Sequence, residues 1–297
     1  VHIEHVPKLT DARRHLVMEA AQFPDELQGV FENLERNSNP WGFGAHTRSD
    51  WAEGMELKVG EPAEYLFYVG CAGSFDNRNK QVSRTLAHLM QQAGVDFSIL
   101  GEAEMCNGDL ARRSGNEFLF QMLAEMNVAT LQEAGVQKIV TACPHCFHTI
   151  GKEYGDYGGD FEVIHHTQLL AELREQGKLK ISDRNTTLTY HDPCYMGRID
   201  DSHEAPRKAL GGDILEMHRC RDKTFCCGAG GARMWVEEDA DKRVNLIRAQ
   251  EALDTGADEV GTGCPFCMTM LTDGMKTLGS ETQVRDISEI MAEQLEA

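Results

Sequence analysis

The sequence lacks several features that would assign the protein to a common class. It has no run of about 18 apolar residues, so no segment is predicted to span a membrane as a helix. Its first residues contain no apolar signal-peptide core and no initiator methionine, so we expect a fragment or a processed subunit. A GxGxxG motif after a strand, a P-loop and a Ser/His/Asp signature are all missing. Flavin or nicotinamide binding by this chain is therefore unsupported.

Basic residues are also scarce. The 29 lysines and arginines stand against 48 aspartates and glutamates, which gives a net charge of −19. Nucleic acids and anionic membrane surfaces both attract clustered basic side chains, so neither is an expected partner. The acidic surplus indicates a solvated acidic surface. A binding surface for a basic protein partner is the more specific alternative interpretation. The expected location is the cytoplasm or, through a partner, the inner face of the membrane.

Cysteines, by contrast, are numerous for a chain with no secretory signal. Ten are present, and in a reducing compartment clustered cysteines are more often metal ligands or redox groups than disulfides. Nine of them form two sets. The first set is Cys71, Cys106, Cys143 and Cys146, and the second set is Cys194, Cys226, Cys227, Cys264 and Cys267. Cys220 has no counterpart in the first set and is interpreted as a structural or incidental thiol.

The spacing within the two sets is nearly the same. Between Cys71 and Cys106 lie 34 residues, and between Cys194 and Cys226 lie 31. The step from the central cysteine site to the following CPxC motif is 36 residues in both sets. This regularity turns a CxxC pair, which is common by itself, into a strong indication of a duplicated metal site.

The segments around the cysteines repeat in the same order. Each half shows strand, helix, short strand, central cysteine site, helix, a strand running into CPxC, and a final strand and helix. The clearest matching segments are 65–70 and 187–193, 97–100 and 213–217, 117–135 and 236–256, 138–146 and 259–267, and 161–173 and 282–295. Strands that alternate with helices predict βαβ units. Because ligands bind at the carboxyl ends of parallel strands, the cysteines of each set should converge there.

The predicted fold class is therefore α/β, with two pseudo-repeated Rossmann-like domains, mostly parallel sheets and a helical N-terminal extension. The expected boundaries are 1–60 for the extension, 61–185 for the first cysteine domain and 186–297 for the second. Within the extension, residues 11–36 predict a helix that is broken near Pro24.

Iron–sulfur clusters explain the residue types in both sets. Iron in such clusters prefers soft thiolates, usually four for each cluster. Each CPxC turn presents two sulfurs from one tight loop. Glycines beside the central cysteines would let the backbone approach a bulky inorganic core and donate amide hydrogen bonds to sulfur. These predicted cofactor-binding glycines are Gly108, Gly228, Gly230 and Gly231.

Cys226 and Cys227 distinguish the second set from the first. Consecutive cysteines are awkward ligands for one tetrahedral ion but suit a cluster with several irons. Asn107 stands where the first set would have its second central cysteine, so four ligands are predicted in the first set and five in the second. A structural zinc ion in each half leaves one of the paired cysteines unexplained. Thioredoxin-like dithiols leave the lone cysteines without a role.

The order of a lone Cys, a CCG and a CPxC, given twice, resembles the CCG-domain iron–sulfur oxidoreductases. This family includes a component of heterodisulfide reductase, the iron–sulfur component of glycolate oxidase and lactate-utilisation proteins. The resemblance covers residues 61–297. It implies that the five-cysteine set can hold a noncubane [4Fe–4S] cluster, while the departure at Asn107 implies a cubane [4Fe–4S] cluster in the first half.

Three stretches carry a closer resemblance: EMCNGDLARRSGNEFLFQMLAEMN, FCCGAGGARMWVEE and NLERNSNPWGF. They are similar to the C-terminal region of membrane-linked oxidoreductases that pass electrons from electron-transfer flavoprotein to menaquinone. The implied function is an electron relay from that flavoprotein, or a ferredoxin-like domain, to a quinone-reducing membrane partner in cis or in trans. Direct disulfide reduction at the second cluster and a structural zinc scaffold stay open as alternatives.

Histidines beside the cysteines are the remaining candidates. His191 precedes Cys194, and either a hydrogen bond to cluster sulfur or a packed side chain is consistent with its position. His145 and His148 flank Cys146. Because the cysteines already suffice as ligands, a position behind the ligands or at the surface is favoured for both histidines.

Overall fold

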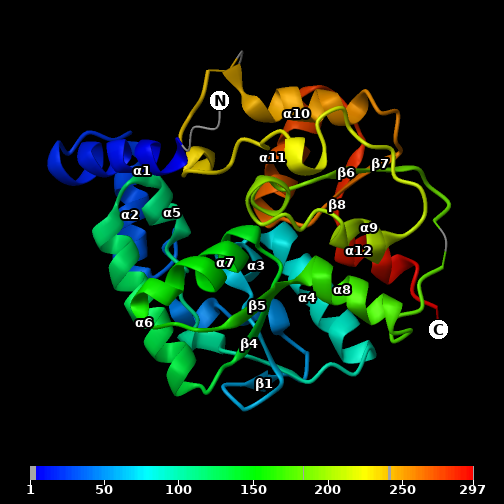
Figure 1. The fold of residues 1–297 in the computed structure, drawn as a ribbon, viewed down its shortest axis with the longest axis horizontal. Helices are drawn as coiled ribbons and strands as arrows, with labels where there is room; N and C mark the ends of the chain where they lie inside the picture. Colours follow the sequence, from blue (N-terminus) through cyan, green and yellow to red (C-terminus); the bar gives the residue numbers. More distant parts are fainter. Residues whose placement is uncertain (1–4, 183, 240–241, 297) are drawn as a thin grey trace.

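Two parallel sheets organise the computed structural model, which describes residues 5–182, 184–239 and 242–296 (Figure 1). The first sheet has the strand order β1-β3-β2-β4-β5 and the second the order β6-β7-β8. Every strand pair within them is parallel. This arrangement confirms the predicted α/β class with mostly parallel sheets. The strands are β1 (Lys58–Val59), β2 (Tyr65–Phe67), β3 (Phe97–Ile99), β4 (Lys138–Thr141), β5 (Glu162–His165), β6 (Leu188–His191), β7 (Glu259–Thr262) and β8 (Gln283–Asp286).

Helices cover both sheets and connect the parallel strands. They are α1 (Val6–Arg14), α2 (Glu26–Asn37), α3 (Gly70–Phe75), α4 (Asn77–Gln92), α5 (Asp109–Ser114), α6 (Glu117–Glu133), α7 (Pro144–His148), α8 (His166–Glu175), α9 (Ala205–Leu210), α10 (Val244–Leu253), α11 (Pro265–Thr277) and α12 (Ile287–Glu293). Because both faces of a parallel sheet are covered, its central strands are largely buried, as Ile139 and Val140 of β4 illustrate. No helix in the described ranges is long and apolar enough to cross a bilayer.

The N-terminal extension is helical, with the predicted interruption near Pro24. Helix α1 continues into a π-helical turn at His15–Glu19, and α2 starts only at Glu26. The extension also contributes structure to the first sheet, because β1 pairs with β3 through Lys58 and Val59. The predicted boundary at residue 60 therefore follows directly after a strand of that sheet.

Two predicted segments of the second half differ from the structure. The strand expected at 213–217 is reduced to one parallel bridge between Leu188 and Ile214. Gly211 and Gly212, with φ of 59° and 63°, turn the chain just before this bridge. The helix expected at 236–256 begins only at Val244, and residues 240–241 of that range lie outside the described residues.

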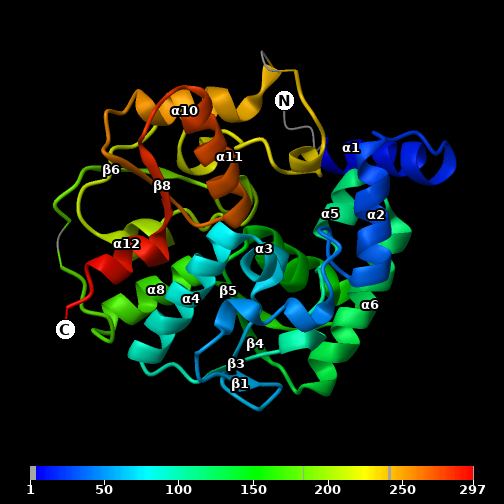
Figure 2. The same cartoon turned by 180° about the vertical axis from the view of Figure 1, so that it is seen from behind.

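One hydrophobic core is shared by the two halves. Figures 1 and 2 show α4 and α8 of the first half lying beside α9 and α12 of the second, between the two sheets. Representative buried side chains of this core are Leu86, Met90, Leu170, Leu210 and Ile290. A common core of this size fixes how the two sheets face each other, and so fixes the relative positions of loops at their ends.

A polar contact reinforces this junction. Asp286 caps α12 by accepting from the Ser288 amide (2.9 Å) and also lies 3.1 Å from Nε2 of His166, the first residue of α8. All three residues are buried. The contact joins a helix of the first half to the last strand of the second.

We expect an Asp286→Ala substitution to lower the free energy of unfolding by about 2 kcal/mol, because it removes a helix cap and leaves a buried imidazole unpaired. Denaturant titration followed by circular dichroism measures the loss. Asp286→Asn keeps an acceptor for the Ser288 amide, so its free energy of unfolding should fall clearly less. Equal losses in the two variants would contradict a contribution from the cap.

Candidate metal centres

Each CPxC motif opens a helix. Cys143 is the N-cap of α7 and Cys264 the N-cap of α11, and the proline that follows is the first helical residue in each case. In α11 the Cys267 amide donates to the Cys264 sulfur over 3.4 Å. Unpaired amides and the helix dipole both favour negative charge at such an end. The local fold of the motif therefore supports thiolates before any metal is considered.

The first set of cysteines converges at the ends of β2 and β4, as the repeat predicted. Cys71 is the second residue of α3, after β2; Cys106 lies in the loop before α5, and Cys143 and Cys146 follow β4. All four thiols are buried and line one cavity. A hydrogen bond with Cys106, together with burial, raises the pKa of Cys71, and Cys143 does the same for Cys146.

The opposite wall of this cavity comes from the second half and the N-terminal extension. Gly230, Gly231, Trp235 and Phe266 all line it. The Trp235 ring contacts Trp41 of the extension edge to face, with ring centres 5.1 Å apart. Gly230 and Gly231, which the sequence associated with the second set, therefore face the first set. The first site is complete only when the two halves are packed together.

The first site has the surroundings that a cluster requires. Gly70 has a left-handed backbone (φ +75°), and a Cβ there would lie 3.3 Å from the Cys146 sulfur, inside the space that the thiols enclose. The Asn107 side-chain amide donates to the Cys146 sulfur over 2.8 Å, and the Gly108 amide donates to Cys106 over 3.5 Å. Four soft sulfurs with amide donors around them fit an iron–sulfur cluster.

Arg48 is a part of the first site that the sequence analysis did not identify. It comes from the extension, is 3% exposed, and its guanidinium lies 3.4 Å from the Cys71 sulfur. It also donates to the Glu104 carbonyl, while the Glu104 carboxylate accepts from the amides of Val69 and Gly70 at 2.9 Å each. A buried cation beside a thiol stabilises the thiolate. No local sequence motif identifies this residue, because it is 23 positions from Cys71.

The second set forms a continuous series of sulfur contacts. Hydrogen bonds with Cys194 and Cys227 lower the pKa of Cys226 to about 2. Cys227 also contacts Cys267, which contacts Cys264. Consecutive cysteines thus join the lone cysteine to the CPxC pair, as a cluster with several irons would need. Gly228 donates its amide to the Cys226 sulfur over 3.2 Å.

The two sets differ in exposure. All cysteines of the first set are buried, whereas Cys194 and Cys226 of the second are partly exposed. Cys220 is also partly exposed, but its neighbours are Glu216 and Asp192 rather than the other thiols. The second set is therefore the more exposed of the two.

His191 faces the second set as a neutral hydrogen-bond donor. Its Nδ1 accepts from Nε of Arg248 over 2.8 Å, which places the ring proton on Nε2. Burial and the Arg248 charge lower the pKa of His191. Nε2 is buried without a hydrogen-bond partner in the described part of the chain, and a ring nitrogen lies within 4.8 Å of the sulfurs of Cys227 and Cys267. The arrangement suits donation to sulfur better than ligation of iron.

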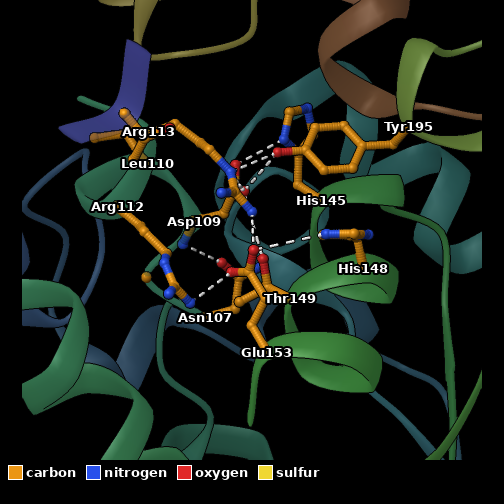
Figure 3. Close-up of polar contacts among 12 residues, drawn as sticks. Asn107, Asp109, Leu110, Arg112, Arg113, His145, His148, Thr149, Glu153 and Tyr195 are labelled. Carbon is orange, nitrogen blue, oxygen red and sulfur yellow. Dashed lines mark hydrogen bonds and ion pairs between the residues drawn. The ribbon is translucent and has the colours of Figure 1, made fainter. Parts of the chain in front are cut away.

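The other flanking histidines have different surroundings. His148 lies 3.1 Å from the Asp200 carboxylate through Nδ1 and is also paired with Glu153, away from the cysteines. His145 extends from the first CPxC turn towards the second half, where its ring packs against Tyr195 and against Phe266 of the second CPxC turn. Its partner within the first half is Asp109, at 2.7 Å (Figure 3). The sequence placed both histidines near Cys146 and could not show that His145 packs against the other CPxC turn.

Comparison with known proteins defines the class to which this chain belongs. The family model described as a cysteine-rich domain, CCG, matches residues 65–151 and 188–272, which cover both cysteine sets. The chain therefore belongs to the CCG cysteine-rich domain family. This result confirms the resemblance seen in the two cysteine motifs.

Curated relatives narrow the class to iron–sulfur oxidoreductases. The EtfAB:quinone oxidoreductase of Syntrophomonas wolfei is 42% identical over 99% of this chain and 44% of the relative. The probable iron-sulfur-binding oxidoreductase FadF of Bacillus subtilis is 42% identical over 98% and 44%. A component of the dihydromethanophenazine:CoB–CoM heterodisulfide reductase of Methanosarcina barkeri is 34% identical over 92% and 69%. The chain spans less than half the length of the first two relatives.

A solved structure of a putative Asp/Glu racemase from Yersinia pestis aligns with 77% of this chain and 95% of its own, at 13% identity and a TM-score of 0.33. This similarity is too low to inform the site.

We expect a His191→Leu substitution to lower the reduction potential of a cluster held by the second set by about 60 mV, the equivalent of one hydrogen bond to a charged acceptor. Potentiometric titration followed by electron paramagnetic resonance measures it. His165→Leu is the matched control, since His165 is also fully buried but bonds Thr167. A potential that moves equally in both variants would mean that repacking, not hydrogen bonding, causes the shift.

Proposed function

We propose that this chain carries two [4Fe–4S] clusters and relays electrons between a flavoprotein and a quinone-reducing membrane partner. The observation that carries the proposal is the convergence of nine buried or half-buried cysteines into two sets, in a chain of the CCG family. Each set lies in one half of the chain, within the proposed domains 61–185 and 186–297. The clusters would supply one-electron chemistry, and the protein would supply ligation, hydrogen bonds and burial.

The geometry of each set supports an assignment of ligands. Cys71, Cys106, Cys143 and Cys146 would hold a cubane cluster, with Asn107 and Gly108 donating to its sulfurs. The five cysteines of the second set would hold a noncubane cluster, because the Cys226–Cys227 pair offers one thiolate more than a cubane needs. Gly228 and His191 would donate to that cluster. Gly230 and Gly231 would let the second half approach the first cluster closely.

The partners are proposed from the relatives. The Syntrophomonas relative is named for EtfAB and a quinone, so an electron-transfer flavoprotein is the donor that we propose. A quinone-reducing membrane domain or subunit, in cis or in trans, would be the acceptor, with a ferredoxin-like domain as an alternative immediate partner. The chain itself would then work at the inner face of the membrane through that partner.

A second function is favoured by the exposure of the second set. Cys194 and Cys226 are partly exposed, and a heterodisulfide reductase component is among the relatives. A disulfide substrate could therefore reach this cluster. The reaction would take two electrons from the redox partner and two protons from solvent, break the S–S bond and release two thiols.

The first experiment is iron, zinc and acid-labile sulfide analysis of anaerobically purified protein. Two [4Fe–4S] clusters predict about eight irons and eight sulfides per chain, with two distinguishable paramagnetic signals. About two zinc ions without labile sulfide, and no iron uptake on reconstitution, would instead establish a structural zinc scaffold.

The five-ligand assignment has its own test. We expect Cys227→Ser to change the signal of the second cluster and to leave the signal and iron content of the first unchanged, because the thiols next to Cys227 all belong to the second set. Cys220→Ser is the matched control and should change neither signal. Identical spectra of Cys227→Ser and the unmodified protein would refute the fifth ligand.

A further inference from the structure

The N-terminal extension reaches a sulfur of the first set through one buried cation. Arg48 follows the 3₁₀ turn at Ala45–Thr47 and precedes the first segment that matches the CCG family, which begins at residue 65. Its guanidinium donates to the Cys71 sulfur through two nitrogens, Nη2 at 3.4 Å and Nη1 at 3.8 Å. A guanidinium stays protonated in proteins, so this donor depends on no titration. A permanent positive charge therefore lies against one predicted ligand.

Further contacts fix the orientation of this guanidinium. Its Nε donates to the Glu104 carbonyl, and its central carbon lies 5.1 Å from the centre of the Phe75 ring. The Glu104 carboxylate is 3.9 Å from Nε and accepts from two backbone amides of the loop before Cys71. The Cys71 sulfur is thus closer to the guanidinium than the carboxylate is. The fork of Arg48 is held with its two Nη atoms directed to sulfur.

The same segment of the extension supports a second ligand loop of the first set. The Cys106 amide donates to the Ser38 carbonyl over 2.8 Å. Asn39, which is 1% exposed, fixes the following turn by bonding both the amide and the carbonyl of Phe43. Arg48 therefore lies on a segment that is anchored to the first site at two separate ligand loops.

The second set has no equivalent cation. Cys194 is the counterpart of Cys71 in the repeat. Over residues 5–182, 184–239 and 242–296, no lysine or arginine donates to a sulfur of the second set, where the amide donors are Gly228 and Cys267. Arg248 is buried near this set, but its Nε donates to His191 instead. The buried cation on sulfur is thus a difference between two otherwise repeated sites.

We propose that Arg48 acts through the Cys71 sulfur to raise the reduction potential of the first cluster, so that a segment outside the repeat sets the potential difference between the two sites. The proposal rests on the two-cluster function above. Reduction adds negative charge to a cluster and its sulfurs, so a cation that donates to a ligand sulfur stabilises the reduced state. Arg48 is 3% exposed, and solvent screens a buried charge weakly. The extension therefore offsets the effect of burial on reduction of the first site.

The experiment is a potentiometric titration, followed by electron paramagnetic resonance, of the full chain with both clusters assembled anaerobically. Arg48→Met keeps an unbranched apolar stem but removes the charge and both donors. The first-cluster potential should fall by the equivalent of a tenfold change in the one-electron equilibrium, about 59 mV. The second-cluster potential and the iron content should stay unchanged. Arg48→Lys, which keeps a charge but not the planar fork, should restore part of the shift.

Arg84→Met is the matched control. The Arg84 guanidinium also supports the extension, because it donates to the backbone carbonyls of Trp51 and Glu53 at 2.7 Å and 2.9 Å rather than to a cysteine. Both potentials should stay unchanged in this variant. A first-cluster potential that falls as far as in Arg48→Met would show that a loosened extension, and not the lost cation, causes the shift.

Other outcomes would also overturn the proposal. An unchanged first-cluster potential in Arg48→Met, with both clusters present, would show that Arg48 only packs beside Cys71. An equal fall in both potentials would remove the link to the first site. If Arg48→Met does not assemble the first cluster, Arg48→Gln is compared with Arg48→Lys: a lower potential in the neutral variant supports the proposal, and equal potentials contradict it. Failure of the two-cluster function itself is recognised separately, from the iron content and spectra of the unmodified protein.

Discussion

The parallel pairing of the strands is the constraint on which both cysteine sets depend. Cys71 and Cys143 are 72 positions apart in the chain, but β2 and β4 are neighbours in the sheet and run in the same direction. Residues that follow such strands meet at one edge of the sheet. The same applies to Cys194 after β6 and Cys264 after β7. Sheet topology, rather than sequence proximity, therefore assembles each group of sulfurs.

The shared core extends this constraint to the relation between the two sites. Helices α4, α8, α9 and α12 pack into one hydrophobic cluster, so the two sheets cannot be repositioned independently without opening buried apolar surface. As a result, the loop with Gly230, Gly231 and Trp235 closes the cavity of the first set. Neither half builds its complete metal environment alone, although each has its own sheet and its own cysteines.

The duplication has diverged in ways that matter for chemistry. Asn107 places an amide donor on Cys146 where the second half has the thiol of Cys227. The first set is wholly buried, and the second exposes parts of Cys194 and Cys226. A buried, amide-supported site suits electron transfer, since a protein environment that stays fixed needs little rearrangement on reduction. A more exposed site with an additional thiolate is better suited to contact with a partner or a substrate.

Much of this organisation could be predicted from the sequence, because spacing and periodicity are local properties. The nearly equal steps between cysteines, the strand-like runs before them and the CPxC turns predicted the α/β class, the parallel sheets and the two sulfur sets. The missing strand at 213–217 was not predictable, since Gly211, just before it, packs against the guanidinium of Arg174 in α8, a contact between segments distant in the chain. Arg48, Gly70 and His145 owe their roles to contacts between segments distant in the chain. Which sulfur a side chain meets depends on the direction in which it points once the halves are packed, and only the tertiary structure decides that direction.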